Sequence, residues 1–403
     1  MSSSSFEVPT DAPLRQDASI ISLVGLAHAG SHFGHLLLPL MFPVFMKEFS
    51  LSYAELGLLM TTFFVISGLG QTLAGFLVDR IGARPLLFAA MGIFMLACFA
   101  ASMVTGYTGL LLVAALAGMG NATFHPVDFT IMNQRVSAPR MGYAFSAHGL
   151  TGYLGWTAAP LFFATFSGLY NWRTAYLAAV LMYLCILLLL IAQRDKLSTR
   201  PVVRHPDQAA QHSLDFMKLP VVWWCFSFFF LSTMTMAVVQ SFSLSILRAM
   251  HGVSLEAATL TLSAYMLCGA LGMLVGGFVA AHNSNSDRIV ALSMGAGALL
   301  LALCGTGLLG GTLTMVVLAS TGFAIGIGGP SRDMMIRKAT PQGATGRVYG
   351  MVYSGLDTGL AVSPLVFGLF MDHGWYRATL LGAALTLSLS VVAALGVGRR
   401  TTR

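Results

Sequence analysis

Residues 160–166 read PLFFATF and residues 364–370 read PLVFGLF, so a segment from the first half of the chain recurs in the second. Shortly after each copy stands an arginine at a matching position, Arg173 in the first half and Arg377 in the second. Internal similarity between two halves of a long apolar chain is typical of transporters built from two related bundles of helices. The repeat therefore predicts such an architecture.

The composition indicates a chain embedded in a membrane. Of the 403 residues, 56% are hydrophobic and 9% are charged, and the mean hydropathy is +0.77. Soluble proteins carry roughly a quarter charged residues, so this composition excludes the water-soluble classes. The net charge of +7 is expected to mark cytoplasmic loops rather than a nucleic-acid partner, because basic residues gather on the cytoplasmic side of membrane proteins.

A helix needs about 20 largely apolar residues to cross a bilayer. The sequence predicts twelve such spans, at 20–46, 54–78, 85–104, 108–134, 142–166, 172–193, 219–247, 255–281, 288–306, 312–336, 347–371 and 376–397. We expect an all-α membrane protein with two pseudo-symmetric six-helix bundles. The expected parts are a cytoplasmic tail at 1–19, bundles at 20–193 and 219–397, a cytoplasmic linker at 194–218 and a second cytoplasmic tail at 398–403.

The basic residues set the expected orientation. With a cytoplasmic N-terminus, all but four of the 22 Lys and Arg residues lie on the cytoplasmic side. This asymmetry predicts that both termini are cytoplasmic, because basic residues near span ends stay on that side. We expect a multi-pass protein of a bacterial-type inner membrane.

The loop between the second and third spans, residues 75–85, reads GFLVDRIGARP. It resembles the signature loop of the major facilitator superfamily, glycine-x-leucine-x-aspartate-arginine-x-glycine-x-arginine, and the resemblance covers essentially the whole chain. It implies a gating loop formed by Gly75, Asp79, Arg80, Gly82 and Arg84. Asp79 is expected to interact with the positive N-terminal end of span eleven and with a neighbouring arginine, stabilising the outward-open form. The alternative is a topology marker without a gating role.

A closer resemblance is to the fosmidomycin-resistance-like branch of drug exporters. It rests on Ser31-His32-Phe33 in span one and Phe124-His125-Pro126 in span four. The chain departs from that branch at His35, near which an acidic residue is usual, and at Ala159, where glycine usually precedes the proline. The resemblance implies secondary transport of a small organic solute by alternating access, with proton-driven export favoured on this basis alone. A monomer is expected.

Polar side chains inside the spans are candidate functional groups, because an ionisable group in hydrocarbon is costly without a partner or a polar cavity. The candidates for a cavity that takes substrate and protons are His28, His32, His35, His125, Asp128, His148, Gln240, Arg332, Asp333 and Asp357. The resemblance implies that spans one, four, seven and ten line the central cavity, with five, eight and eleven beside it. The candidates fall on six of these seven spans.

The histidine row (His28, His32 and His35) is predicted to share one face of span one, because its members recur at helical spacing. Three interpretations stay open: proton relay or contact with an anionic substrate, a metal site, and hydrogen bonds to a neighbouring helix. Acidic or thiolate co-ligands are not evident near the row in the sequence. No metal ion is therefore expected.

Three charged residues have alternative roles. Asp357 lies near the middle of span eleven, where it is a candidate for proton coupling, for an ion pair with a span-ten arginine, or for a polar brace. Asp128 and Arg332, toward the cytoplasmic ends of spans four and ten, are candidates for a lock between the halves. Arg332 could instead hold a substrate carboxylate or phosphonate.

Alternatives to export also stay open. The first is a proton-coupled importer of a small organic anion, the second a carrier of a metal or metal chelate, and the third a receptor that does not transport. The sequence contains no P-loop lysine motif and no arrangement of residues suited to catalysis. We therefore expect no ATP drive, no cofactor and no enzymatic activity.

Overall fold

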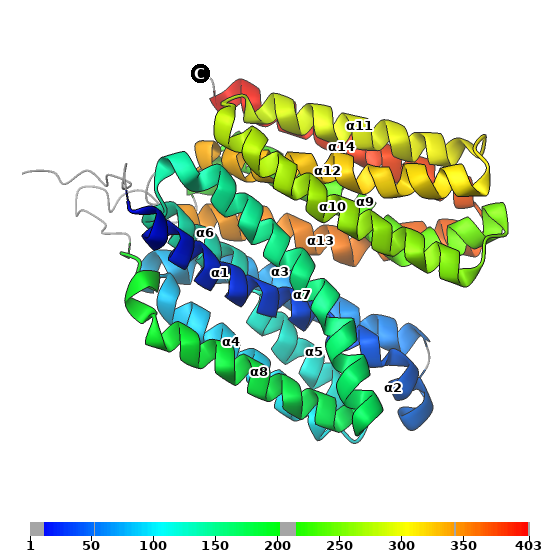
Figure 1. The fold of residues 1–403 in the computed structure, drawn as a ribbon, viewed down its shortest axis with the longest axis horizontal. Helices are drawn as coiled ribbons and strands as arrows, with labels where there is room; N and C mark the ends of the chain where they lie inside the picture. Colours follow the sequence, from blue (N-terminus) through cyan, green and yellow to red (C-terminus); the bar gives the residue numbers. More distant parts are fainter. Residues whose placement is uncertain (1–11, 52, 202–214, 342–343, 402–403) are drawn as a thin grey trace, which may run out of the picture. The chain divides into compact units, whose positions relative to one another are not determined.

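The computed structural model describes residues 12–51, 53–201, 215–341 and 344–401. Parts of the predicted tails and linker, at 1–11, 202–214 and 402–403, lie outside these residues. The helices of the first half are α1 (Leu14–His35), α2 (Phe42–Phe49), α3 (Tyr53–Ile81), α4 (Ala83–Ser102), α5 (Tyr107–Asn121), α6 (Phe124–Arg135), α7 (Met141–Leu169) and α8 (Trp172–Ala192). Those of the second half are α9 (Pro220–His251), α10 (Leu255–His282), α11 (Ser286–Thr306), α12 (Gly311–Ala339), α13 (Thr345–Asp372) and α14 (Tyr376–Thr401) (Figure 1).

Eleven helical stretches in the described chain are long and apolar enough to cross a membrane, and α7 is a further helix of 29 residues. Together they coincide, in order, with the twelve predicted spans. Two spans are interrupted, which the sequence analysis did not predict. Span one breaks after His35, and span four breaks between Asn121 and Phe124. Pro126 then lies in the first turn of α6, where the missing N–H leaves no hydrogen bond unmade.

The chain forms two compact units. The first comprises Met1–His212 with Pro341–Ser354, and the second comprises Ser213–Thr340 with Gly355–Arg403. The first turns of α13 thus fall in the first unit, while the predicted bounds of the two bundles stay a prediction. The physical reason is a set of contacts between these turns and α3, described below.

The same pairs of helices pack together in both units. In the first unit α3 and α4 pack along α5, and α4 packs along α8 (Figure 1). In the second unit α10 and α11 pack along α12, and α11 packs along α14. Since α10, α11, α12 and α14 follow one another in the order of α3, α4, α5 and α8, the repeat in the sequence corresponds to a repeat in helix packing.

The repeated arginine caps a helix in the first unit. The Arg173 guanidinium donates hydrogen bonds to the carbonyl oxygens of Ser102 at 3.1 Å and Val104 at 2.7 Å, at the end of α4. These carbonyls have no partner inside the helix, so the arginine satisfies them. In the second unit the Arg377 guanidinium lies against Gly307, the C-cap residue of α11.

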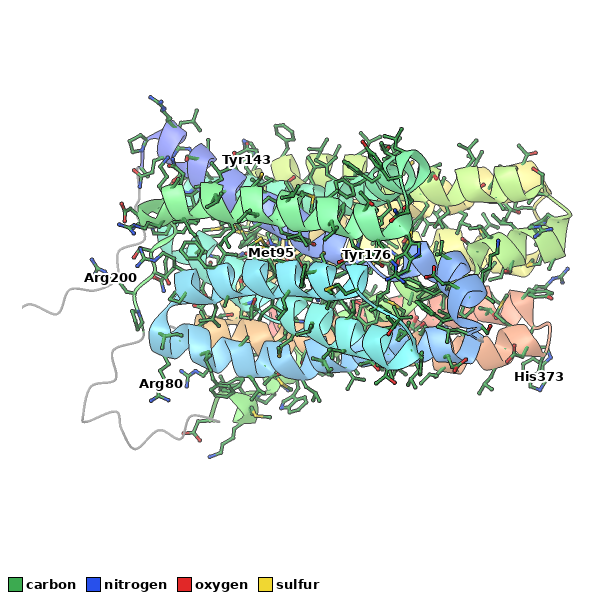
Figure 2. The ribbon with its side chains drawn as sticks, turned by 90° about the horizontal axis from the view of Figure 1, so that it is seen from below. Arg80, Met95, Tyr143, Tyr176, Arg200 and His373 are labelled. Carbon is green, nitrogen blue, oxygen red and sulfur yellow. The ribbon has the colours of Figure 1, made fainter. Side chains whose placement is uncertain are left out.

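The outer surface matches a lipid environment. On α3, Leu69, Leu73 and Leu77 follow one another at helical spacing and have exposed fractions of 69%, 65% and 50%. Exposed apolar side chains on long apolar helices are expected to face acyl chains. Two basic residues, Arg80 and Arg200, lie at the same end of the first unit (Figure 2).

Candidate functional site

The histidine row forms one face of α1, as predicted. The ring centroids of His28 and His32 are 4.4 Å apart, and those of His32 and His35 are 5.0 Å apart. His28 and His35 are buried, and His32 is half-buried. The row is therefore a continuous set of imidazoles inside the first unit.

Helix α7 approaches this row closely at Gly152. A Cβ atom at Gly152 would lie 2.7 Å from Cε1 of His32 and 3.2 Å from Nε2 of His28. Carbon atoms cannot come within the shorter distance without overlap in a close-packed interior. The absence of a side chain at this position therefore makes room for the two rings.

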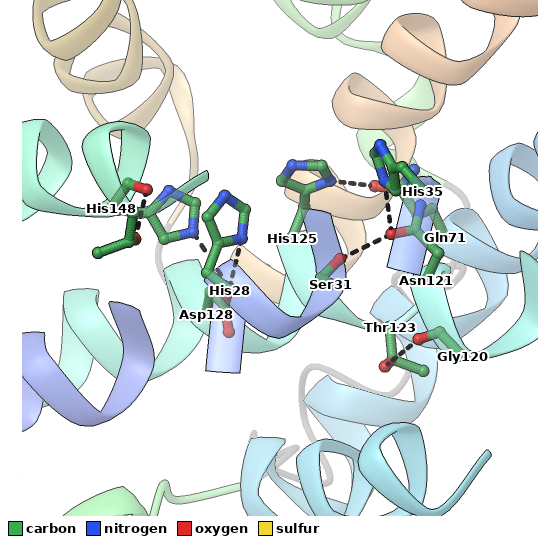
Figure 3. A network of polar contacts seen from close by, with 11 residues as sticks. His28, Ser31, His35, Gln71, Gly120, Asn121, Thr123, His125, Asp128 and His148 are labelled. Carbon is green, nitrogen blue, oxygen red and sulfur yellow. Dashed lines mark hydrogen bonds and ion pairs between the residues drawn. The ribbon is translucent and has the colours of Figure 1, made fainter. Parts of the chain in front are cut away.

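Asp128 on α6 lies between two imidazoles. Its Oδ2 atom is 3.1 Å from Nδ1 of His28 and 3.1 Å from Nε2 of His148, which comes from α7 (Figure 3). The side chain of Asp128 is fully buried, and those of His28 and His148 are 3% and 5% exposed. The rings of His28 and His148 stack with centroids 3.6 Å apart. We call these three residues the Asp128 cluster.

His125 extends the same group of imidazoles. Its ring centroid lies 5.7 Å from that of His28. Its Nδ1 atom is 2.9 Å from Oε1 of Gln71 on α3 (Figure 3), and its ring stacks on Tyr353 in the first turns of α13 at 4.3 Å. His125 thus joins the histidines to α3 and α13.

Asn121 is a buried polar residue that the sequence analysis missed. Its Oδ1 atom accepts a hydrogen bond from Ser31 at 2.7 Å and lies 2.9 Å from Nε2 of His35 (Figure 3). Its amide nitrogen donates a hydrogen bond to Ser67 at 2.8 Å. The search for ionisable residues passed over it because an amide carries no charge. An amide in an apolar span was itself a usable signal, because buried polar groups need partners.

Four of the predicted residues lie in the second unit. Gln240 on α9 is half-buried and Asp357 on α13 is buried. On α12, Arg332 donates two hydrogen bonds to the carboxylate of its neighbour Asp333, at 2.8 and 3.1 Å. Asp128 and Arg332 thus each have a partner inside their own unit, and the lock between them stays a prediction.

The signature loop makes the contacts expected of Asp79. Its Oδ1 atom accepts a hydrogen bond from the backbone N–H of Gly346 at 2.9 Å, and its Oδ2 atom accepts one from Nε of Arg347 at 2.8 Å. Both residues belong to the first turn of α13, where N–H groups lack partners within the helix. A side chain at Gly75 would collide with the backbone of Gly346, so glycine allows this approach.

The other loop residues have local roles. Gly82 ends α3 with a φ of +83°, a conformation that favours glycine. Arg84 donates a hydrogen bond to the carbonyl oxygen of Arg194 at 3.3 Å, and Arg80 is exposed. Asp79 is therefore the member of the loop that ties α3 to α13.

The sequence profile of the Major Facilitator Superfamily matches residues 24–325 and 251–403. The chain belongs to the Major Facilitator Superfamily. A solved proton:xylose symporter has a TM-score of 0.76 to this chain, with 13% identity and coverage of 94% of this chain and 95% of that one. A second solved member, in an outward conformation, has a TM-score of 0.74 with coverage of 94% and 98%. These likenesses confirm the predicted twelve-helix fold of two bundles.

Curated relatives match this chain at low sequence identity. The fosmidomycin resistance protein of Escherichia coli is 25% identical over 270 residues, and the match covers 65% of each chain, just under two thirds of that protein's length. Multidrug resistance protein D of the same organism is 29% identical over 36% of each chain. The probable nitrate/nitrite transporter of Mycobacterium tuberculosis is 25% identical over 81% of this chain and 82% of its own. The protein is thus a multi-pass membrane protein of this superfamily.

Proposed function

We propose that this superfamily member exports a small organic solute across a bacterial inner membrane by alternating access, driven by protons. The observation that supports this most is the Asp128 cluster, in which a buried carboxylate lies 3.1 Å from two imidazoles. Such a set offers three neighbouring side chains that can accept or release a proton when water reaches them. Two relatives named for drug resistance support export.

Asp128 is our first candidate for the coupling residue. It is fully buried and lies 3.1 Å from an imidazole nitrogen on each of two other helices, so a change in its protonation alters contacts among three helices at once. Asp357, also fully buried, is the second candidate. Replacing each by asparagine separates them, because the residue that couples transport to protons is the one whose replacement abolishes the response to a pH gradient.

Import of a small anion is the second candidate function. It is supported by the likeness to a probable nitrate/nitrite transporter over most of both chains and by Arg332, which could bind an anion. Against it, the guanidinium of Arg332 already donates two hydrogen bonds to Asp333. An anion would have to compete with a carboxylate for the same donors, so we favour export.

Gating is assigned to Asp79. In this proposal its bonds to the first turn of α13 hold one state of the transport cycle, and their rupture accompanies the change to the other. The anion at the start of a helix is favourable because the free N–H groups there carry partial positive charge.

Susceptibility to fosmidomycin tests the proposal first. An Escherichia coli strain without its own fosmidomycin resistance protein would express this chain or its Asp128→Asn variant. Export predicts that the wild type raises the inhibitory concentration and that the variant, present in equal amount in the membrane, does not. Equal protection by both would overturn the role of Asp128. Protection by neither would reject this substrate and direct the test to other solutes.

A further inference from the structure

The Asp128 cluster has the composition and spacing of a metal site. It offers two imidazole nitrogens and one carboxylate oxygen, and these ligand atoms all lie within 4.8 Å of one another. The sequence analysis found no acidic ligand near the histidine row, because Asp128 is distant from it along the chain. Folding brings the carboxylate of α6 against α1 and α7 and supplies the missing ligand.

Three polar atoms, two in the Asp128 cluster and one on the adjacent His32, lack a hydrogen-bond partner among the described residues. They are Oδ1 of Asp128, Nδ1 of His28 and Nδ1 of His32, all of them buried. His28 Nδ1 lies near Oδ2 of Asp128 but without the alignment of a hydrogen bond. Since buried polar groups nearly always have partners, a ligand at this place would satisfy atoms that the protein does not.

We propose that His28, Asp128 and His148 bind a divalent transition-metal ion of the zinc class. Zinc binds nitrogen and oxygen at about 2.0–2.2 Å in tetrahedral sites, which places neighbouring ligand atoms roughly 3.3 Å apart. The two observed separations of 3.1 Å from Oδ2 of Asp128 are close to that value, and binding one ion requires the stacked rings of His28 and His148, now 3.6 Å apart, to turn away from each other. Magnesium and calcium prefer ligand sets made of oxygen alone, so the two imidazoles favour zinc, cobalt or nickel.

A second set of ligands adjoins the first and shares one residue with it. His28, His32 and His125 also present ligand atoms within 4.8 Å of one another. The contact of His125 Nδ1 with Gln71 at 2.9 Å orients the ring, as outer partners of metal-binding histidines do. Because the two sets share His28, the second set offers an ion a neighbouring position beside the first. Binding of the metal ion at equilibrium does not depend on the direction of transport.

Cobalt and zinc binding to the purified full chain test the inference. The protein is prepared in detergent with an affinity tag that contains no histidine. Visible absorption of bound Co²⁺ reports the ligand set, and Zn²⁺ is then used to displace it. We expect one Co²⁺ per chain, bound by nitrogen and oxygen and displaced by Zn²⁺. Absence of stoichiometric binding, or absorption typical of thiolate ligands, would overturn the site.

Variants locate the ion. Asp128→Asn and His148→Gln are each expected to weaken Zn²⁺ binding at least about tenfold, since even outer partners of metal ligands have effects of that size. His373→Gln, at an exposed position directly after α13, is the matched control and should leave affinity unchanged. Unchanged affinity in both cluster variants would place the ion elsewhere and refute the proposal. If a variant does not fold, the Co²⁺ spectrum of the wild type still decides the identity of the ligands.

Discussion

Asp79 on α3 and Arg347 on α13 form an ion pair of 2.8 Å, with side chains 10% and 16% exposed. The same carboxylate accepts the backbone N–H of Gly346 at 2.9 Å. One aspartate thus closes the first turn of α13 and neutralises the arginine beside it. This relationship explains why the first turns of α13 belong with the first unit.

Replacing Asp79 by alanine should lower the free energy of unfolding by about 1–3 kcal/mol, because it removes a helix cap and leaves a partly buried guanidinium without this partner. Unfolding in mixed detergents measures the loss. Arg80→Ala, in the same loop but exposed, should change stability by no more than about 0.5 kcal/mol. Equal losses in both variants would contradict the assignment of the contact to Asp79.

The approach of α7 to the histidines gives a second prediction. Gly152→Ala should destabilise the protein by about 1–3 kcal/mol, since the new methyl group would overlap the His32 ring. On the same helix, a Cβ at Gly168 meets nothing within 4 Å, so Gly168→Ala should be neutral or stabilising through helix propensity. The unfolding free energies of the two variants are compared directly. An equal change in both would show that it comes from placing alanine in this helix, rather than from overlap with the His32 ring.

Asn121 should be more important for stability than its neutral side chain suggests. Asn121→Ala removes the hydrogen bonds that Ser31, His35 and Ser67 make to this side chain, and we expect a loss of at least about 2 kcal/mol. Thr157→Ala serves as the control, because that exposed hydroxyl bonds only within its own helix among the contacts described. Thermal unfolding of the two variants checks this, and a larger loss for Thr157→Ala would refute it.

Zinc binding should weaken as the pH falls. Metal ligands must be deprotonated, and an ordinary imidazole has a pKa of about 6.5. Protons therefore compete with the metal ion for Asp128, His28 and His148 as the pH falls. Titrations at about pH 7.5 and about pH 5.5 should differ by at least tenfold in affinity. Equal affinities at both would argue against imidazole ligands.

Much of the fold follows from the sequence, because a membrane fixes the length of each apolar helix. The twelve spans and their order were predicted, and so was the shared face of His28, His32 and His35. The breaks after His35 and Asn121 were not, because hydropathy averages over them. The meeting of Asp128 with His28 and His148 was also beyond the sequence, since it depends on how α1, α6 and α7 pack.

The most direct test of the Asp128 cluster is solute movement into proteoliposomes under an imposed pH gradient. Vesicles are incubated with a mixture of metabolites and antibiotics, and their contents are compared with those of empty liposomes by mass spectrometry. We predict that the wild type concentrates at least one solute only when the gradient is present, and that Asp128→Asn does not. Accumulation that ignores the gradient, or that persists unchanged in Asp128→Asn, would contradict the account.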